Sequence, residues 1–177
     1  MATSCLTHLE CARCSERVDP GVLQTFCSCG GTWLARYNLE AAARSLNPET
    51  FLNRRVGFWS YPEVSPSQSD GASRGLGEGG TPLLPIRALP ELELNLFAKD
   101  EGINPGGSFK ARGMASAVSR AKELGASALA LPSAGNAGVA AAQYGAFWNL
   151  PVHVALPVET PAPFRDAIQT HGATVYE

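Results

Sequence analysis

The residues best suited to chemistry are a lysine and an asparagine, each in a glycine-containing motif. Lys110 lies in the segment 104–113, which reads N-P-G-G-S-F-K-A-R-G, and Asn136 lies in the segment 133–138, which reads S-A-G-N-A-G. Glycines let a backbone approach a ligand closely, and a helix that begins at the lysine would favour an anion at its N-terminus. A lysine amine placed there can act as a nucleophile toward a carbonyl cofactor, and the asparagine amide can donate to a phenolate or carboxylate oxygen.

Each of these motifs also has an ordinary structural explanation. Most lysines are solvated surface charges, and the same holds for Arg112. Ser108 and Asn136 are residue types that commonly cap helices. Because both motifs occur in one chain, separated by one predicted helix and one predicted strand, we favour the functional interpretation for Lys110 and Asn136.

Strand and helix patterns alternate around the two motifs. The expected strands cover residues 92–99, 127–131, 152–156 and 173–176, and the expected helices cover 108–124, 136–148 and 160–171. This order predicts an α/β fold, with an open, mostly parallel sheet that has helices on both faces and right-handed crossovers. In such sheets ligands bind beyond the carboxyl ends of strands, and both motifs would follow such an end. Neither motif is the glycine pattern of a dinucleotide site or a Walker loop, which disfavours NAD and ATP.

Composition and charge place the chain among soluble globular proteins. Of its 177 residues, 45% are hydrophobic and 17% are charged, and the formal charge is -2, without the excess of lysine and arginine of a nucleic-acid binder. No stretch approaches the roughly 18 apolar residues of a membrane span, and the N-terminus lacks the regions of a signal peptide. The sequence therefore predicts a cytoplasmic protein with neither a nucleic-acid partner nor a membrane partner.

The cysteines suggest a metal site near the N-terminus. All of them lie in the first 29 residues, as Cys5 and two close pairs. The pairs are Cys11, Cys14, Cys27 and Cys29. In a reducing compartment such clustering favours a metal over disulfides, and two thiolate pairs can close a tetrahedron around a structural Zn²⁺. The second pair is spaced more tightly than usual, so His8 or Cys5 is an alternative ligand, and metal-free thiols in a poorly ordered arm are the other interpretation.

A third motif, G-E-G-G-T-P-L at 77–83, completes a pattern with the lysine and asparagine motifs. Together the three motifs closely resemble the motifs of the threonine synthase family. The members of this family are fold-type II pyridoxal-phosphate enzymes of the tryptophan-synthase-beta superfamily. The resemblance covers about residues 77–177. Several threonine synthases also carry a cysteine-rich N-terminal ribbon, which agrees with the paired cysteines.

The resemblance implies a role for each matching residue. Lys110 would be the Schiff-base lysine of pyridoxal 5'-phosphate, and Asn136 would hydrogen-bond the ring hydroxyl oxygen of that cofactor. Backbone amides and the serine hydroxyl would cradle the carboxylate of a small amino-acid substrate, through Ser133, Ala134, Gly135 and Ala137. Thr81 would line the same cleft without an assigned role. The implied reaction converts O-phospho-L-homoserine and water to L-threonine and phosphate with Lys110 as proton carrier, and the implied assembly is a homodimer.

The sequence departs from the family pattern at two positions beside the lysine. Gly106 stands where many relatives have threonine, and Ala111 where others have aspartate, so both bear on substrate choice. In the family a glycine-rich loop beyond the asparagine motif fixes the cofactor phosphate, and no stretch after Asn136 offers one, so an incomplete form of the enzyme is expected. Threonine dehydratase, a cysteine-synthase-like enzyme and a non-catalytic zinc-ribbon binding fragment are the alternative functions.

Three units follow from these patterns. Residues 1–37 form a zinc-ribbon-like unit, residues 38–76 a helix and flexible linker, and residues 77–177 a partial pyridoxal-phosphate-dependent catalytic domain. In the middle unit a helix is expected at 39–46, with Asn38 as its N-cap, and the aromatic residues at 57–61 are expected to be a packing anchor. The serine- and glycine-rich stretch 65–80 predicts a flexible linker or surface loop.

Overall fold

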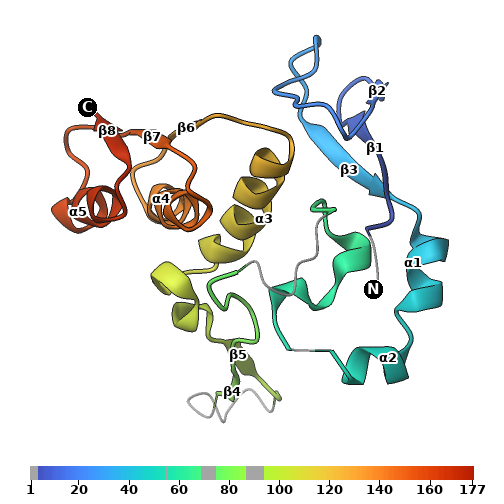
Figure 1. Ribbon diagram of the computed structural model, residues 1–177. Coiled ribbons are helices and arrows are strands. Elements are labelled where there is room, and N and C mark those ends of the chain that lie inside the picture. The colour runs from blue at the N-terminus through green and yellow to red at the C-terminus, as the bar shows by residue number, and fades with distance from the viewer. Residues whose placement is uncertain (1–3, 55, 69–74, 87–93) are drawn as a thin grey trace.

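The computed structural model describes residues 4–54, 56–68, 75–86 and 94–177. Its ribbon runs from an N-terminal part, blue and green in Figure 1, to a C-terminal part in yellow and red. The N-terminal part holds a small antiparallel sheet and the short helices α1 and α2. The C-terminal part holds the longer helices α3, α4 and α5 and a parallel sheet.

The N-terminal sheet has β1 as its central strand. Its strands are β1 (Leu6–Cys11), β2 (Arg17–Val18) and β3 (Trp33–Tyr37), in the antiparallel order β2-β1-β3. Glu10 of β1 pairs with Arg17 of β2 at 3.3 Å and with Arg36 of β3 at 2.6 Å. Opposite charges across an antiparallel sheet help to fix its register. The sheet therefore holds the end of β1, where Cys11 lies, in a defined place.

The two short helices are each capped by an asparagine. The helix predicted at 39–46 is confirmed as α1 (Leu39–Ser45), and the Asn38 side chain caps it by accepting a 2.9 Å hydrogen bond from a backbone N–H of the first turn. A second helix, α2 (Pro48–Leu52), follows at once and is capped in the same way by Asn47. Pro48 cannot continue α1, because it has no N–H for the helical hydrogen bond. It can begin α2, because the first turn of a helix does not use that N–H.

The segment that follows α2 is packed against the C-terminal part. It contains two 3-10 helices, Phe58–Ser60 and Pro62–Val64. The indole N–H of Trp59 donates to the carboxylate of Glu78, and the ring packs on a buried cluster, which confirms the predicted packing anchor for Trp59, whereas Tyr61 is exposed. Part of the linker predicted at 65–80 lies outside the described residues. Its C-terminal part is held in place, because Glu78 is only 2% exposed.

The last turns of α3 (Lys110–Glu123) also contact the N-terminal part. Arg120 donates a 2.6 Å hydrogen bond to the carbonyl of Pro20, and the two residues are 100 positions apart in the sequence. Glu123 accepts a hydrogen bond from the hydroxyl of Ser67. The C-terminal end of α3 is thus tied to the cysteine-rich unit and to the segment after it.

The strands and helices predicted after the lysine motif are confirmed. The parallel sheet has the order β6-β7-β8, with α4 and α5 as crossover helices. The elements after α3 are β6 (Leu129–Pro132), α4 (Asn136–Trp148), β7 (Val152–Ala155), α5 (Ala162–Thr170) and β8 (Thr174–Tyr176). Within the described part of the chain, no helix is long and apolar enough to cross a bilayer.

The prediction that helices cover both faces of this sheet is wrong for the described residues. α4 and α5 connect adjacent strands in the same direction, so they lie on one face, where Figure 1 shows them side by side. Val152 and Val154 of β7 face these helices and are buried. The other face presents a shallow groove of about 450 Å³, lined by Ala130, Leu131, Pro132, His153, Ala155 and Tyr176. β6 and β7 alternate large apolar residues with small or polar ones, which is the pattern of strands with a single covered face.

The strand predicted at 92–99 does not join the parallel sheet. Residues 92 and 93 lie outside the described residues, and β5 (Phe97–Lys99) pairs antiparallel with β4 (Leu83–Pro85) in a separate sheet. Alternation of apolar and polar residues is typical of antiparallel strands, whereas buried parallel strands read as continuous apolar runs. The lysine motif therefore follows the small sheet, and only the asparagine motif follows the carboxyl end of a parallel strand.

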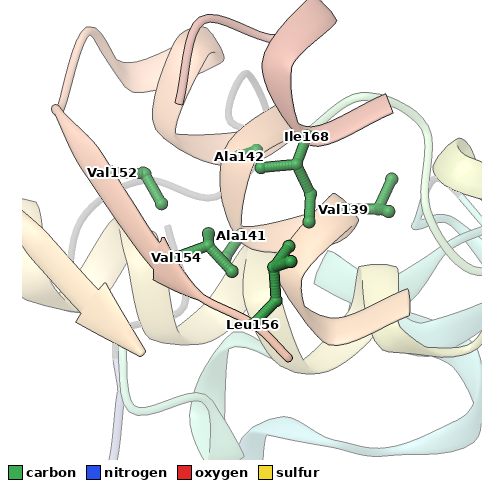
Figure 2. Packing of buried hydrophobic residues seen from close by; sticks show 7 residues of the cluster. All are labelled: Val139, Ala141, Ala142, Val152, Val154, Leu156 and Ile168. Carbon is green, nitrogen blue, oxygen red and sulfur yellow. The ribbon is translucent and has the colours of Figure 1, made fainter. Parts of the chain in front are cut away.

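A helix rich in glycine and alanine forms the centre of the C-terminal core. Figure 2 shows the buried cluster where α4, β7 and α5 meet, which comprises Val139, Ala141, Ala142, Val152, Val154, Leu156 and Ile168. Small residues let α4 lie close to β7, because a Cβ added to Gly145 would come 2.2 Å from Cγ2 of Val152. A second cluster joins α3 to α4 through Ala111, Ala115, Val118, Tyr144 and Leu150. Close packing of this kind fixes where α3 and α4 begin relative to the sheet.

Candidate functional site

Two left-handed glycines shape the turn before Lys110. Gly106 and Gly107 have φ angles of 72° and 71°, a region that residues with a Cβ rarely enter. Gly106 also lies against α4, because a Cβ added there would come 3.0 Å from Oε1 of Gln143. A threonine at this position would be strained, so glycine suits this turn.

Lys110 begins α3, and its amine has no fixed acceptor. Its backbone N–H donates a 3.3 Å hydrogen bond to Oγ of Ser108, so this serine supports the start of the helix. The ammonium lies 4.9 Å from the centre of the Phe109 ring and donates no hydrogen bond to any described residue. An amine in this state is available to a carbonyl group.

The asparagine motif forms the turn between β6 and α4. Oγ of Ser133 accepts a 2.8 Å hydrogen bond from the Gly138 N–H, and the Ser133 N–H donates 2.9 Å to the carbonyl of Ala155. The serine therefore closes the turn and ties it to β7. Three N–H groups find no acceptor among the described residues, those of Ala134, Asn136 and Ala137. Free N–H groups at the start of a 13-residue helix form a site that favours an anion.

The structure places Lys110 and Asn136 at equivalent positions on two packed helices. Asn136 is exposed at the first position of α4, and its amide has no hydrogen-bond partner in the described chain. Lys110 occupies the first position of α3. The two helices pack on each other, and the turn before the lysine touches α4 at Gln143. Both motifs are thereby carried by one helix pair.

A polar network joins the G-E-G-G-T-P-L motif to the lysine motif. The Glu101 carboxylate accepts hydrogen bonds from Nε and Nη2 of Arg112 at 2.7 and 2.8 Å, from Oγ1 of Thr81 at 2.7 Å and from Nδ2 of Asn104 at 2.8 Å. Asn104 in turn accepts a 2.9 Å hydrogen bond from the Gly79 N–H. Thr81 and Asn104 are buried. One carboxylate thus binds three residues of the two motifs, Thr81, Asn104 and Arg112.

Sequence reasoning misses this network. From the sequence alone Arg112 is a solvated charge and Thr81 has no assigned role, whereas in the structure both bind Glu101. Hydrogen bonds from Arg112, followed by that from Thr81, lower the pKa of Glu101 to about 2. One sequence signal was present: α3 begins with basic residues, and cations at a helix N-terminus are disfavoured unless an anion compensates them.

A second buried carboxylate lies in the same motif. Glu78 accepts hydrogen bonds of 2.7 Å from the Tyr144 hydroxyl and 2.8 Å from the Leu76 N–H, in addition to that from Trp59. Burial and the neighbouring carboxylate raise the pKa of Tyr144, so the phenol stays protonated and keeps its donor. Glu78 thereby joins α4 to the aromatic segment of the N-terminal part.

The paired cysteines converge beside the small N-terminal sheet. Their Sγ atoms all lie within 4.8 Å of one another, in a group made of Cys11, Cys14, Cys27 and Cys29. Two Sγ–Sγ distances between the pairs are 3.5 Å. A tetrahedron with Zn–S bonds of about 2.3 Å has edges of about 3.8 Å, so the donor set fits Zn²⁺. Within the described residues, neither Cys5 nor His8 belongs to this group.

Left-handed residues turn the chain after each cysteine pair. Ser15 follows the first pair with a φ of 61°, and Gly30 follows the second with a φ of 78°. A Cβ added to Gly31 would come 2.5 Å from Sγ of Cys11, so the missing side chain makes room for the sulfur. Backbone N–H donors, that of Cys14 above all, lower the pKa of Cys11 to about 6. The lowered pKa favours the thiolate, the form that binds a metal, at Cys11 alone, because hydrogen bonds with neighbouring side chains raise the pKa values of Cys14, Cys27 and Cys29.

Comparison with known proteins identifies the family. A family model described as pyridoxal-phosphate dependent enzyme matches residues 75–177, which include all three motifs. Threonine synthase from Methanocaldococcus jannaschii is 37% identical over 139 residues, which cover 77% of this chain and 34% of that protein. Threonine synthase from Methanosarcina acetivorans is 35% identical over 172 residues, which cover 95% of this chain and 42% of that protein. The chain belongs to the pyridoxal-phosphate dependent enzyme family.

Solved structures and the extent of the alignments agree with this assignment. The crystal structure of a pyridoxal 5'-phosphate-dependent aspartate racemase matches with a TM-score of 0.52 and 28% identity, and covers 55% of this chain and 32% of that chain. The resemblance drawn from the motifs is therefore confirmed. The chain spans 34% and 42% of the lengths of the two threonine synthases. The family implies pyridoxal phosphate as cofactor and leaves the reaction of this chain to be inferred from its site.

Proposed function

We propose that this chain supplies the cofactor lysine of a threonine synthase, which converts O-phospho-L-homoserine and water to L-threonine and phosphate. The observation that carries the proposal is the identity to threonine synthases, 37% and 35% for the two compared above. The lysine, asparagine and G-E-G-G-T-P-L motifs all fall within the residues that the family model matches.

Lys110 is the residue that would hold the cofactor. When bound, pyridoxal phosphate supplies an electron sink for a carbanion at the substrate Cα. The Lys110 amine has no hydrogen-bond acceptor in the described chain, so it would be free to hold the cofactor through its aldehyde group, and once released it would carry a proton to and from the substrate. The amide of Asn136, exposed at the start of α4, would donate to the ring hydroxyl oxygen.

The turn before α4 would bind the carboxylate of the amino-acid substrate. Ala134 and Ala137 offer N–H groups that have no acceptor in the described part of the chain, and the N-terminal end of the helix dipole adds a favourable field. The N–H of Gly135 makes only a long hydrogen bond of 3.4 Å to Oγ of Ser133. Ser133 supports the shape of the turn, because its hydroxyl already accepts from Gly138.

We further infer that the four clustered cysteines bind Zn²⁺ and that this ion is structural. Four protein ligands would leave no open coordination position for catalysis. The inference is supported by Sγ atoms within 4.8 Å of one another and by the room that Gly31 leaves for Cys11. The Glu16 carboxylate lies 3.0 Å from Sγ of Cys27, so it would turn away once this sulfur is a metal-bound thiolate.

The partners of the proposed enzyme follow from its reaction. The substrate is a small amino acid that carries a phosphate ester. No described residue is assigned to bind this phosphate group. A homodimer and a cytoplasmic location stay predictions from the sequence.

Reductive trapping tests the cofactor assignment. The lysines of the chain are Lys99, Lys110 and Lys122. Pyridoxal phosphate with cyanoborohydride should label Lys110 ahead of the other two, as read by peptide mass spectrometry. Lys110→Arg keeps the charge and should abolish the preferred label. Equal labelling of all three lysines would contradict the proposal.

Product analysis separates threonine synthase from its relatives. With O-phospho-L-homoserine, the protein made from the complete reading frame and loaded with cofactor should release phosphate and threonine in equal amounts. Formation of 2-ketobutyrate from threonine would indicate a threonine dehydratase, and cysteine formed from O-acetylserine and sulfide would indicate a cysteine-synthase-like enzyme. Zinc binding without any preferred label at Lys110 would indicate a non-catalytic binding fragment.

A further inference from the structure

We propose that Glu101 is a positioning residue for the cofactor lysine: through Arg112 it fixes the first turn of α3 and, with it, the direction from which Lys110 meets the cofactor. The inference rests on the proposed function of Lys110 and extends it to a residue that does not touch the cofactor. Its basis is the bidentate pair between Glu101 and Arg112, at 2.7 and 2.8 Å.

Apart from the 3.3 Å hydrogen bond from the Lys110 N–H to Oγ of Ser108, the start of α3 has none of the usual supports of a helix N-terminus among the described residues. Phe109, at the N-cap position, has no side-chain acceptor, and the first turn contains no acidic residue. It carries Lys110 and Arg112 instead, although cations are disfavoured at this end of the helix dipole. The first N–H groups of a helix also lack partners within it. Glu101 compensates from outside the helix, because it brings a negative charge to the first turn.

The direction of the lysine side chain is set by the backbone of this turn. Residues two apart on a helix point about 200° apart, so Arg112 is held on one side of α3 while Lys110 projects from another. Ala111 lies between them and is fully buried in the core. These two neighbours fix the rotation of the turn about the helix axis. The Lys110 amine makes no hydrogen bond to a described residue that could set its own direction.

Glu101 can hold Arg112 at a defined angle because Glu101 is itself held. Thr81 and Asn104 each donate to one oxygen of its carboxylate, and Asn104 also binds Gly79. A guanidinium–carboxylate fork sets an angle as well as a distance. The side chains of Arg112 and Glu101 are 29% and 25% exposed, so solvent screens part of their attraction. The pair contributes more to geometry than to the stability of the fold.

Glu101→Gln tests the proposal, because it keeps the size of the side chain and removes the charge that matches Arg112. In this variant the rate at which pyridoxal phosphate and cyanoborohydride label Lys110 should fall by about tenfold. The rate at Lys122, at the far end of α3, should stay the same. If Glu101 only stabilised the fold, Glu101→Gln would lower the Tm but leave the rate of Lys110 labelling unchanged at temperatures well below the Tm. That result would overturn the proposal.

Glu123→Gln is the matched control. Glu123 pairs with Arg120 at 3.1 Å in the last turn of the same helix, so its loss should change the Lys110 rate by less than about twofold. Arg112→Gln should reproduce the effect of Glu101→Gln. The double variant should be no worse than either single one, because each removes the same contact. Additive losses would show that Glu101 does not act through Arg112 and would overturn the proposal.

A measurement without cofactor separates this proposal from the proposed function. Amide hydrogen exchange in the first turn of α3, residues 110–114, should be faster in Glu101→Gln than in the unmodified chain and unchanged in Glu123→Gln. If pyridoxal phosphate labels no lysine preferentially in the unmodified chain, the cofactor assignment fails. Amide hydrogen exchange then remains as the test of whether Glu101 positions the first turn of α3. Exchange that is unchanged in both variants would overturn that role.

Discussion

Tyr144 of α4 donates a 2.7 Å hydrogen bond to the carboxylate of Glu78, and this contact connects the helix that begins at Asn136 with the loop that precedes Thr81. Both partners are buried, at 0% and 2% exposed. A buried carboxylate is costly when one of its donors is lost. This buried contact therefore connects the G-E-G-G-T-P-L motif to the helix that carries the asparagine motif.

Tyr144→Phe should lower the free energy of unfolding by about 1–3 kcal/mol, because it leaves an oxygen of Glu78 without this donor. Urea titration followed by fluorescence measures the change. Tyr61→Phe is the control, since Tyr61 is 46% exposed, and it should change the free energy by less than about 0.5 kcal/mol. Equal effects of the two substitutions would show that Glu78 does not depend on the Tyr144 hydroxyl.

Gly145→Ala should destabilise the chain by about 1–3 kcal/mol, because its Cβ would come 2.2 Å from Cγ2 of Val152 and 2.9 Å from the carbonyl oxygen of Leu150. Gly113→Ala in α3 is the contrast. Nothing lies within 4 Å of a Cβ at that position, and the alanine should stabilise the helix by about 0.5–1 kcal/mol. Thermal unfolding followed by circular dichroism ranks the variants. Shifts of the same sign would contradict the close approach of α4 to β7.

Glu101 should make the stability of the chain depend on acid pH. Hydrogen bonds from Arg112 and then Thr81 lower the pKa of Glu101 from its usual 4.5 to about 2. A carboxyl whose pKa is lowered in the folded state stabilises the fold above its unfolded pKa, and this contribution is lost as the pH falls from about 4.5 through about 2. Urea midpoints of the unmodified chain and Glu101→Gln should therefore differ most at neutral pH and converge in acid. A difference that does not vary with pH would contradict the ionised pair.

Loss of the metal should loosen the cysteine-rich unit before the rest of the chain. Metal analysis should find about one zinc per chain, because four thiolates complete one tetrahedral site. Cys29→Ser should lose the ion, whereas Cys5→Ser, outside the cluster, should keep it. Chelation should speed amide exchange in residues 4–37 and leave α4 protected, since structural zinc binding is coupled to local folding. Equal zinc retention in the two serine variants would rule out the proposed ligand set.

Much of the C-terminal fold could be predicted from the sequence because its elements have clear local patterns. Apolar residues at helical spacing identified α3 and α5, an alanine-rich stretch identified α4, and short apolar runs identified β6 and β7. For the residues that the structure describes, the covering of the sheet was predicted wrongly, although β7 carries the relevant signal. Val152 and Val154 alternate with His153 and Ala155, and only the two valines are buried. A strand buried on both faces would not show this alternation.

The chemistry-bearing residues could be predicted in part. Lys110 and Asn136 could be proposed because their motifs are local in sequence; their roles stay predictions, and the family match confirms only the resemblance that these motifs support. The Glu101 network was missed, because Arg112 lies 11 residues from Glu101 and 31 from Thr81 without any periodic spacing. What brings Thr81 to Glu101 is the antiparallel pairing of β4 with β5. From the sequence, β5 was placed in the parallel sheet, so neither the pairing of β4 with β5 nor the contact between Thr81 and Glu101 was predicted.

The bond between Pro20 and Arg120 has a consequence for how the chain is made. The two residues are 100 positions apart, so at about 5–20 residues per second the loop of Pro20 leaves the ribosome about 5–20 s before Arg120 does. During that interval only bonds within the N-terminal unit can hold the loop in shape. If the cysteines bind zinc, metal capture is an early co-translational step, and the zinc supply at the ribosome governs how many chains present a finished unit for α3 to dock on.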